Sequence, residues 1–279
     1  MTFKSNLEIL ATAGLTPYIA ASRMVLPALD QSVIGRAGHI YLLERAEDRS
    51  FHEAFRLANA LGFTSPALKM PDWVLVDCVL MQTAIIGFAI AKKRAPNDLI
   101  AAFEGDSSFN LADLGYLPVS GQIAGLSLDG QSLVGFSLFS LRRYLPQVPA
   151  LGVITKALAL QVYRAQGRRF IGLAFWDNRV LSMQGRFGRP MKIESTTVPI
   201  YPARVHAMTY SMIIDFDPDE MHERESPGDF DFLLRADDEA KKYEMSRGQA
   251  EGMEYIIVPP YQIEKNGVIE LPIRIESTH

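Results

Sequence analysis

A proline-broken loop that leads into a helix is the feature of this chain that most directly suggests chemistry. Residues 144–152 read Tyr-Leu-Pro-Gln-Val-Pro-Ala-Leu-Gly, and a helix is expected over 153–164. The first N–H groups of a helix lack carbonyl partners, and the helix dipole favours negative charge there. Thr155 and Lys156 in the first turn would add a hydroxyl and an ammonium group. The sequence therefore predicts an anion-binding site at the start of this helix.

Arg142 and Arg143 end the strand before this loop and could steer an anionic ligand towards it. A plainer interpretation stays open, in which the arginines lie at an exposed strand end and Thr155 and Lys156 are an ordinary helix start with a solvated lysine. The residue types alone do not decide between these two interpretations.

Candidate acids and bases lie elsewhere in the chain. His206, in an expected strand, could act as a general base because an imidazole titrates near neutrality. Glu104 and Asp106 flank Gly105 and could do acid–base work, although a solvated turn fits the same pattern. Asp77 lies inside an apolar run, where a carboxylate must be paired or have a raised pKa. Each of these residues also has a purely structural explanation.

The composition excludes several classes of site and partner. The net charge of −4 implies no general attraction to nucleic acid or to an anionic membrane. Cys78 is the single cysteine, so an intrachain disulfide and a cysteine-rich metal site are excluded, which fits a reducing cytoplasm. The histidines show no metal-ligand spacing, and we predict no metal site.

We expect neither a signal peptide nor a membrane-spanning segment in this sequence. No signal peptide is expected at the N-terminus, because charged residues and a proline interrupt its apolar residues. The apolar run 73–91 contains Asp77, Gln82 and Thr83. We expect it to be buried in a soluble core, as a strand pair or a core helix, rather than to span a membrane.

The elements that must position the loop follow from turn and periodicity signals. Asp129-Gly130 between two apolar runs predicts a hairpin of strands 121–128 and 131–141. After the helix at 153–164, residues 169–175 show no alternation and predict a strand buried on both faces. Asn178 is expected to cap a short helix over 179–186. Residues 122–188 should thus form one contiguous unit.

The remaining segments predict a mixture of helices and hairpins. Helices are expected at 6–15, 20–29, 51–61 with a Ser50–Glu53 capping box, about 98–103, and 236–245. Strands are expected at 39–44 and 205–216, an exposed acidic loop at 217–231, and a hairpin of 255–262 with 268–276 around Asn266-Gly267. This mixture predicts an α+β fold, or an α/β fold with antiparallel pairs.

The segment 133–188 resembles the core of the GNAT-type acyl-CoA N-acyltransferases. That family has a strand, a pyrophosphate-binding loop, a helix, a second strand, and an asparagine that opens a helix ending in Gly-Phe. Here the strand is 133–141, the helix follows Gly152, the second strand is 170–175, and Asn178 opens a helix that ends in Phe187-Gly188. The resemblance covers about a fifth of the chain and implies that the strands holding Val134 and Ile171 are parallel neighbours.

The sequence also departs from the family pattern. The family's phosphate loop reads Gln/Arg-x-x-Gly-x-Gly/Ala, and the segment 149–154 keeps only the central glycine, Gly152. The tyrosine that often protonates the leaving thiolate is missing near Gly185, and the final helix ends Phe-Gly rather than Gly-Phe. A degenerate loop can still bind phosphate through backbone N–H groups.

The resemblance implies a GNAT-like twisted mixed sheet flanked by helices over 1–189. A β-hairpin-rich region is expected at 190–279, and whether it completes the same domain or forms a separate one stays open. It implies an acyl-CoA-dependent N-acyltransferase that acts on a small amine, uses acetyl-CoA or a longer acyl-CoA and needs no metal, with Glu104 and His206 as candidate bases. The expected partners are a small-molecule substrate and a second copy of the chain in a homodimer. No nucleic acid or membrane is expected as a partner. The residues implied in acyl-CoA binding are Ser140, Leu141, Gly152, Val153, Ile154, Thr155, Lys156 and Asn178.

Two other classes of function stay open at this point. A non-enzymatic domain that binds a small molecule or lipid fits a chain rich in apolar strands. A decarboxylase or hydrolase on a β-rich barrel could use Lys156, Asp77 or His206.

Overall fold

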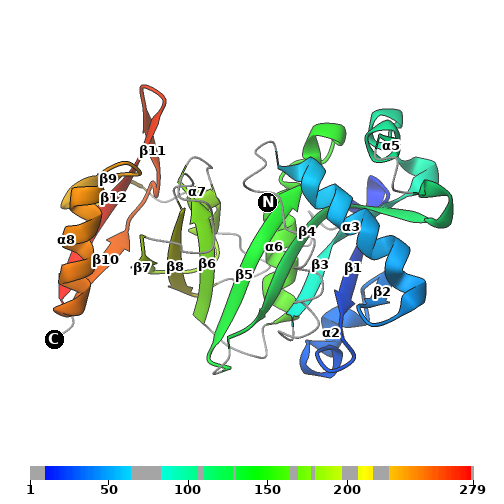
Figure 1. The fold of residues 1–279 in the computed structure, drawn as a ribbon, viewed down its shortest axis with the longest axis horizontal. Helices are drawn as coiled ribbons and strands as arrows, with labels where there is room; N and C mark the ends of the chain where they lie inside the picture. The colour runs from blue at the N-terminus through cyan, green and yellow to red at the C-terminus, as the bar shows by residue number, and fades with distance from the viewer. Residues whose placement is uncertain are drawn as a thin grey trace. The chain divides into compact units, whose positions relative to one another are not determined.

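The chain forms two compact units, Met1–Gly167 and Arg168–His279. The structure is a computed structural model, and it describes residues 10–63, 83–105, 110–127, 130–163, 169–176, 180–196, 207–215 and 226–277. The expected fold class is confirmed, because the protein is a mixed α/β fold with helices against its sheet (Figure 1). The predicted domain boundary at 189/190 stays a prediction, as does the parallel pairing of the strands of Val134 and Ile171, which would join the two units.

Unit 1 contains a five-stranded mixed sheet in the order β2-β1-β3-β4-β5. Among the described strands of this unit, β1 and β2 pair in parallel, and β1–β3, β3–β4 and β4–β5 are antiparallel. The strands are β1 (Leu15–Ala21), β2 (His39–Leu42), β3 (Thr83–Ala91), β4 (Tyr116–Leu126) and β5 (Ser132–Ser140). The helices are α2 (Gln31–Ile34), α3 (Arg49–Gly62), α5 (Asn97–Glu104) and α6 (Leu151–Val162).

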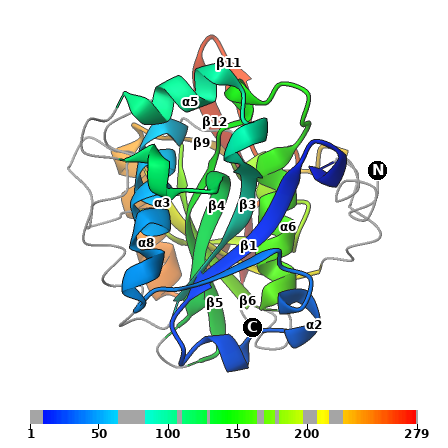
Figure 2. The same cartoon turned by 90° about the vertical axis from the view of Figure 1, so that its right-hand side faces the viewer.

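Helices α3 and α6 cover opposite faces of this sheet, one on each side of the strands in Figure 2. Adjacent residues of β4 show the division: Gly121 lies against Phe55 of α3, and Ser120 contacts Thr155 of α6. Because successive strand residues point to opposite faces of the sheet, β4 can contact both α3 and α6. The start of α6 is therefore supported from below by the centre of the sheet.

Unit 2 contains an antiparallel sheet in which β6, β8, β7, β10 and β12 lie side by side, and β12 also pairs with β11 and β9. The strands are β6 (Arg169–Phe175), β7 (Met191–Ser195), β8 (Ala207–Ile213), β9 (Phe232–Arg235), β10 (Met253–Ile257), β11 (Ile263–Lys265) and β12 (Val268–Ser277). The helices are α7 (Val180–Gln184) and α8 (Glu239–Ala250). Asn266 and Gly267, both at positive φ, join β11 to β12, which confirms the predicted turn. The predicted first strand of this hairpin, 255–262, is wrong, because the strand before the turn is 263–265.

Several predictions from the sequence are wrong. Residues 15–21 form strand β1 rather than parts of two helices, because Tyr18 and Ile19 are buried between β2 and β3. Helix α3 begins after Asp48, so Ser50 is inside the helix and forms no capping box. Strand β6 alternates between buried and half-exposed residues rather than being buried on both faces.

The prediction for the apolar run 73–91 is confirmed in its second half, where β3 is buried over eight consecutive residues. The first half, with Asp77 and Cys78, lies outside the described residues. Among the helices of the described ranges, none is long and apolar enough to cross a membrane.

Candidate functional site

The loop between β5 and α6 is held against the core by apolar side chains at regular intervals. Leu141, Leu145, Val148 and Leu151 are each completely buried. Backbone hydrogen bonds from Tyr144 N to Leu141 O and from Val148 N to Leu145 O fold the intervening residues into turns. Between these anchors, Arg142, Arg143 and Gln147 are exposed, and Tyr144 and Ala150 are half-buried. The loop is thus a fixed platform with polar side chains on its outer surface.

Helix α6 begins at Leu151, two residues earlier than predicted. The residue before it, Ala150, adopts the left-handed conformation with φ 54° and ψ 25°. The hydrogen bond from Ile154 N to Ala150 O, 3.0 Å long, is the first of the helix. The N–H groups of Leu151, Gly152 and Val153 therefore have no carbonyl partner in the helix. A left-handed residue followed by helical ones makes such N–H groups converge, as in backbone anion sites.

Gly152 leaves this helix start open to a ligand. Among the atoms of the described residues, a Cβ atom built on it would meet only the Ser140 Cβ atom within 4 Å, at 3.7 Å. Ser140, the last residue of β5, has a buried Oγ atom with no hydrogen-bond partner within the part of the chain that the structure describes. The Leu141 side chain is buried, and its N–H group already donates to Val119 O at 2.8 Å. Of the residues predicted at this strand end, Ser140 alone offers an uncommitted polar group.

Two arginines lie in the loop that precedes this helix. Arg143 donates a hydrogen bond of 2.9 Å to the Tyr144 hydroxyl, and its guanidinium carbon lies 4.7 Å from the centre of the Tyr144 ring. Arg142 is exposed in the same short turn. Their charge would add to the attraction of the helix dipole for an anion.

Neither Thr155 nor Lys156 presents an exposed side chain at the helix start. Both side chains are completely buried. Thr155 Oγ1 lies 2.7 Å from Ser120 Oγ and 2.8 Å from Leu151 O. Burial lowers the pKa of Lys156 well below its usual range. A solvated ammonium at this position, as the sequence suggested, does not fit this burial, and contacts of either side chain with an anion stay a prediction.

The predicted bases are not brought to this helix start by any contact that the described residues show. Glu104 ends α5 and is exposed, and α5 packs against α3, which covers the other face of the sheet from α6. His206 and Asn178 lie outside the described residues. Within the described ranges no group of three or more His, Cys, Asp or Glu side chains could hold a metal ion.

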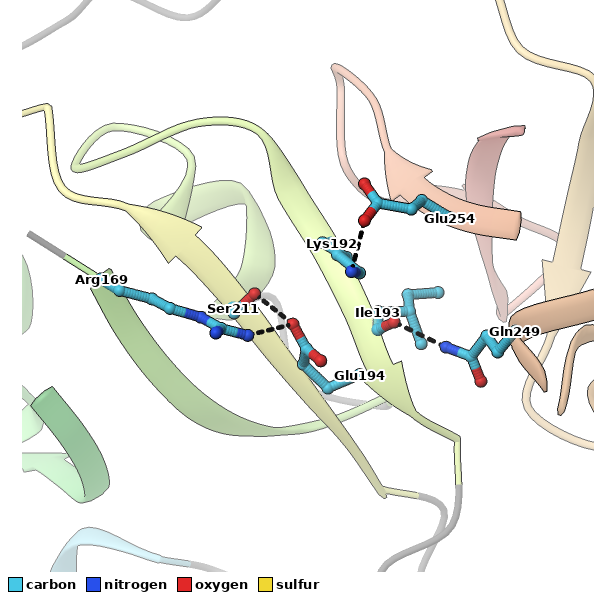
Figure 3. Close-up of polar contacts among 7 residues, drawn as sticks. All are labelled: Arg169, Lys192, Ile193, Glu194, Ser211, Gln249 and Glu254. Carbon is cyan, nitrogen blue, oxygen red and sulfur yellow. Dashed lines mark hydrogen bonds and ion pairs between the residues drawn. The ribbon is translucent and has the colours of Figure 1, made fainter. Parts of the chain in front are cut away.

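A second group of polar side chains lies on the sheet of unit 2 (Figure 3). Glu194 on β7 accepts hydrogen bonds from Arg169 on β6, at 2.9 Å, and from Ser211 on β8, at 2.5 Å. Lys192 on β7 pairs with Glu254 on β10 at 2.6 Å. Each charge is matched by a partner on the next strand or the one beyond it, so the group joins strands and leaves no unmatched charge for a ligand.

Two features of the site were not found from the sequence: the left-handed Ala150 and the hydroxyl of Ser120 beneath Thr155. Alanine gives no signal for a left-handed conformation, which glycine or asparagine would have suggested. Ser120 lies 35 residues before Thr155, and no local pattern connects the two.

Comparison with known proteins gives a distant structural likeness. No protein-family model matches the sequence, and no curated protein matches it. A solved structure from Acinetobacter baylyi ADP1, described as a "Putative Acetyltransferase", is similar with a TM-score of 0.38 and 12% sequence identity. The match covers 65% of this chain and 95% of that one. A likeness at this level says nothing about activity, which has to be argued from the residues.

Proposed function

We propose that the protein is an acyl-CoA-dependent N-acyltransferase that acts on a small amine. The observation that carries the proposal is the start of α6, where the N–H groups of Leu151, Gly152 and Val153 are without helical partners beside an open glycine. Three backbone donors at a helix N-terminus suit the diphosphate of coenzyme A, and the exposed Arg142 and Arg143 add positive charge.

With the observed helix start, the loop matches the family's phosphate-loop pattern at more positions than the predicted segment did. The helix begins at Leu151, and the residues around this start match the pattern Gln-x-x-Gly-x-Gly at Gln147, Ala150 and Gly152, with alanine in place of the first glycine. Ala150 has the left-handed conformation that glycine adopts without strain. This supports the phosphate-loop interpretation, with the motif beginning at Gln147, two residues earlier than the segment 149–154 suggested.

The reaction would join the amine nitrogen to the acyl carbon while the thioester bond breaks. The amine must lose a proton, and the leaving thiolate must gain one. Glu104 and His206 are our candidates for the base, and a water chain could connect either to the amine. The backbone donors at α6 would hold the diphosphate and so fix the thioester without taking part in the bond changes.

Substitutions at Gly152 separate ligand binding from folding. Gly152→Glu should not destabilise the helix, because a carboxylate near a helix N-terminus is favourable, but it should repel a diphosphate. We expect acetyl-CoA affinity to fall at least about tenfold, which corresponds to roughly 1.4 kcal/mol. Titration calorimetry measures the affinity, and thermal unfolding measures the stability.

Gly152→Ala is the matched control for this experiment. Its methyl group has room, and alanine favours a helix over glycine by about 1 kcal/mol, so this variant should be at least as stable as the wild type and retain most of its affinity. Equal affinity in the Glu and Ala variants would place the ligand elsewhere.

A further inference from the structure

A chain of hydrogen bonds connects the centre of the unit 1 sheet to the first turn of α6. Phe88 N–H donates to Ser120 Oγ at 3.3 Å. Leu151 O can only accept, so the Thr155 hydroxyl donates to it at 2.8 Å. The Ser120 hydroxyl then donates to Thr155 Oγ1 at 2.7 Å. In this series of hydrogen bonds, the Ser120 and Thr155 hydroxyls each donate one bond and accept one. The direction of donation therefore runs from β3 to α6.

The chain starts at an irregularity of the sheet. The β3–β4 register shifts between Phe88 and Ala89, where Phe88 pairs with Ser120 and Ala89 with Pro118. A bulge of this kind redirects a side chain, and proline in a strand is often found beside one. The Tyr18 hydroxyl donates to the carbonyl oxygen of Ser120 at 2.9 Å and holds the same residue from the α3 side. Ser120 and Thr155 are both completely buried.

We propose that Thr155 and Ser120 are positioning residues that set the place of the α6 N-terminus for the ligand. Thr155 is one turn from the three free N–H groups, and its hydroxyl is bonded to the carbonyl oxygen of the first helical residue, Leu151. The inference rests on the proposed function and changes the predicted role of Thr155 from contact with the ligand to support of the donors. Donor placement matters because hydrogen bonds weaken steeply with poor geometry.

The far end of the same helix offers a matched control. Tyr163, directly after α6, donates to Ala124 O at 2.6 Å and accepts from Ala84 N–H at 3.0 Å. These bonds tie α6 to the same two strands, β4 and β3, but about two turns away from Thr155. Tyr163→Phe therefore removes a buried contact between helix and sheet without touching the N-terminus.

The test compares Thr155→Val, Thr155→Ser and Tyr163→Phe with the wild type. The affinity for acetyl-CoA is measured by calorimetry well below the unfolding temperature, and thermal unfolding is recorded for each variant. Thr155→Val should weaken binding about tenfold, as expected when one charge-assisted hydrogen bond is lost. Thr155→Ser, which keeps the hydroxyl, should restore most of the affinity. Tyr163→Phe should lower the unfolding temperature without a comparable loss of affinity.

The outcomes separate the two proposals. If the wild type binds acetyl-CoA and Thr155→Val and Tyr163→Phe affect affinity equally, the positioning role is wrong and the proposed function stands. Unchanged affinity in Thr155→Val would also overturn the positioning role. If the wild type does not bind, the proposed function itself fails, and the positioning role fails with it.

Discussion

At the scale of single residues, burial changes what a side chain can do. Lys156 was predicted from its place in the sequence as a surface cation at a helix start, yet it is completely buried. A sequence shows that a lysine follows Thr155 but not that both side chains are buried. The same limit applies to Ala150, whose conformation is imposed by the loop around it.

The burial of Lys156 predicts how stability depends on pH. Burial lowers its folded pKa from the ordinary value of 10.5, so unfolding takes up a proton between the lowered pKa and 10.5. In that window the unfolded chain binds more protons than the folded one, and stability rises as the pH rises. Lys156→Met, similar in length and uncharged, should remove this contribution and raise stability at neutral pH.

Denaturant unfolding of the two proteins between neutral pH and pH 10 measures the difference. The difference in the free energy of unfolding between Lys156→Met and the wild type should become smaller as the pH increases. A difference that is independent of pH, or one that becomes larger, would mean that the folded protein holds the charged amine.

At the scale of elements, close packing between the sheet and α3 depends on glycine in β4. A Cβ atom on Gly121 would lie 2.7 Å from Phe55 Cε2, 2.7 Å from the Tyr18 hydroxyl oxygen and 2.9 Å from Phe139 Cε1. Gly121→Ala should therefore destabilise the protein by about 1–3 kcal/mol, the usual cost of overpacking a core. Urea unfolding measures this cost.

Gly115, just before β4, is the control. A Cβ atom there would meet nothing within 4 Å, and Gly115→Ala should leave stability within about 0.5 kcal/mol of the wild type. Similar losses in both variants would show that crowding against α3 is not the cause.

Elements with strong local signals were the ones that the sequence predicted well. Helix α6 and strand β6 lie close to their predicted ranges, and the Asn266-Gly267 turn joins two antiparallel strands as its residues indicated. Strand β1 was missed because its place between β2 and β3 depends on residues far along the chain. Short strands such as β7 and β9, with few residues to show alternation, were also not predicted.

At the scale of the whole molecule, the structure confirms the mixed α/β class and places the β5–loop–α6 connection in unit 1. The predicted order of elements around this loop was the main clue to function in the sequence. What the sequence could not give is the three-dimensional support of that loop, namely the buried anchors from Leu141 to Leu151 and the Ser120–Thr155 contact. The Ser120–Thr155 contact joins residues that are 35 positions apart, and no local pattern connects them.

The measurement that tests the central claim most directly is titration calorimetry of the wild-type protein with acetyl-CoA and with longer acyl-CoAs, accompanied by thermal unfolding. A ligand that binds the folded state raises the midpoint of unfolding. The account predicts measurable heat and a higher midpoint with at least one acyl-CoA. No heat and no shift at roughly millimolar ligand, a concentration that still detects Kd values of about 1 mM, would contradict it and would favour a different ligand or enzyme class.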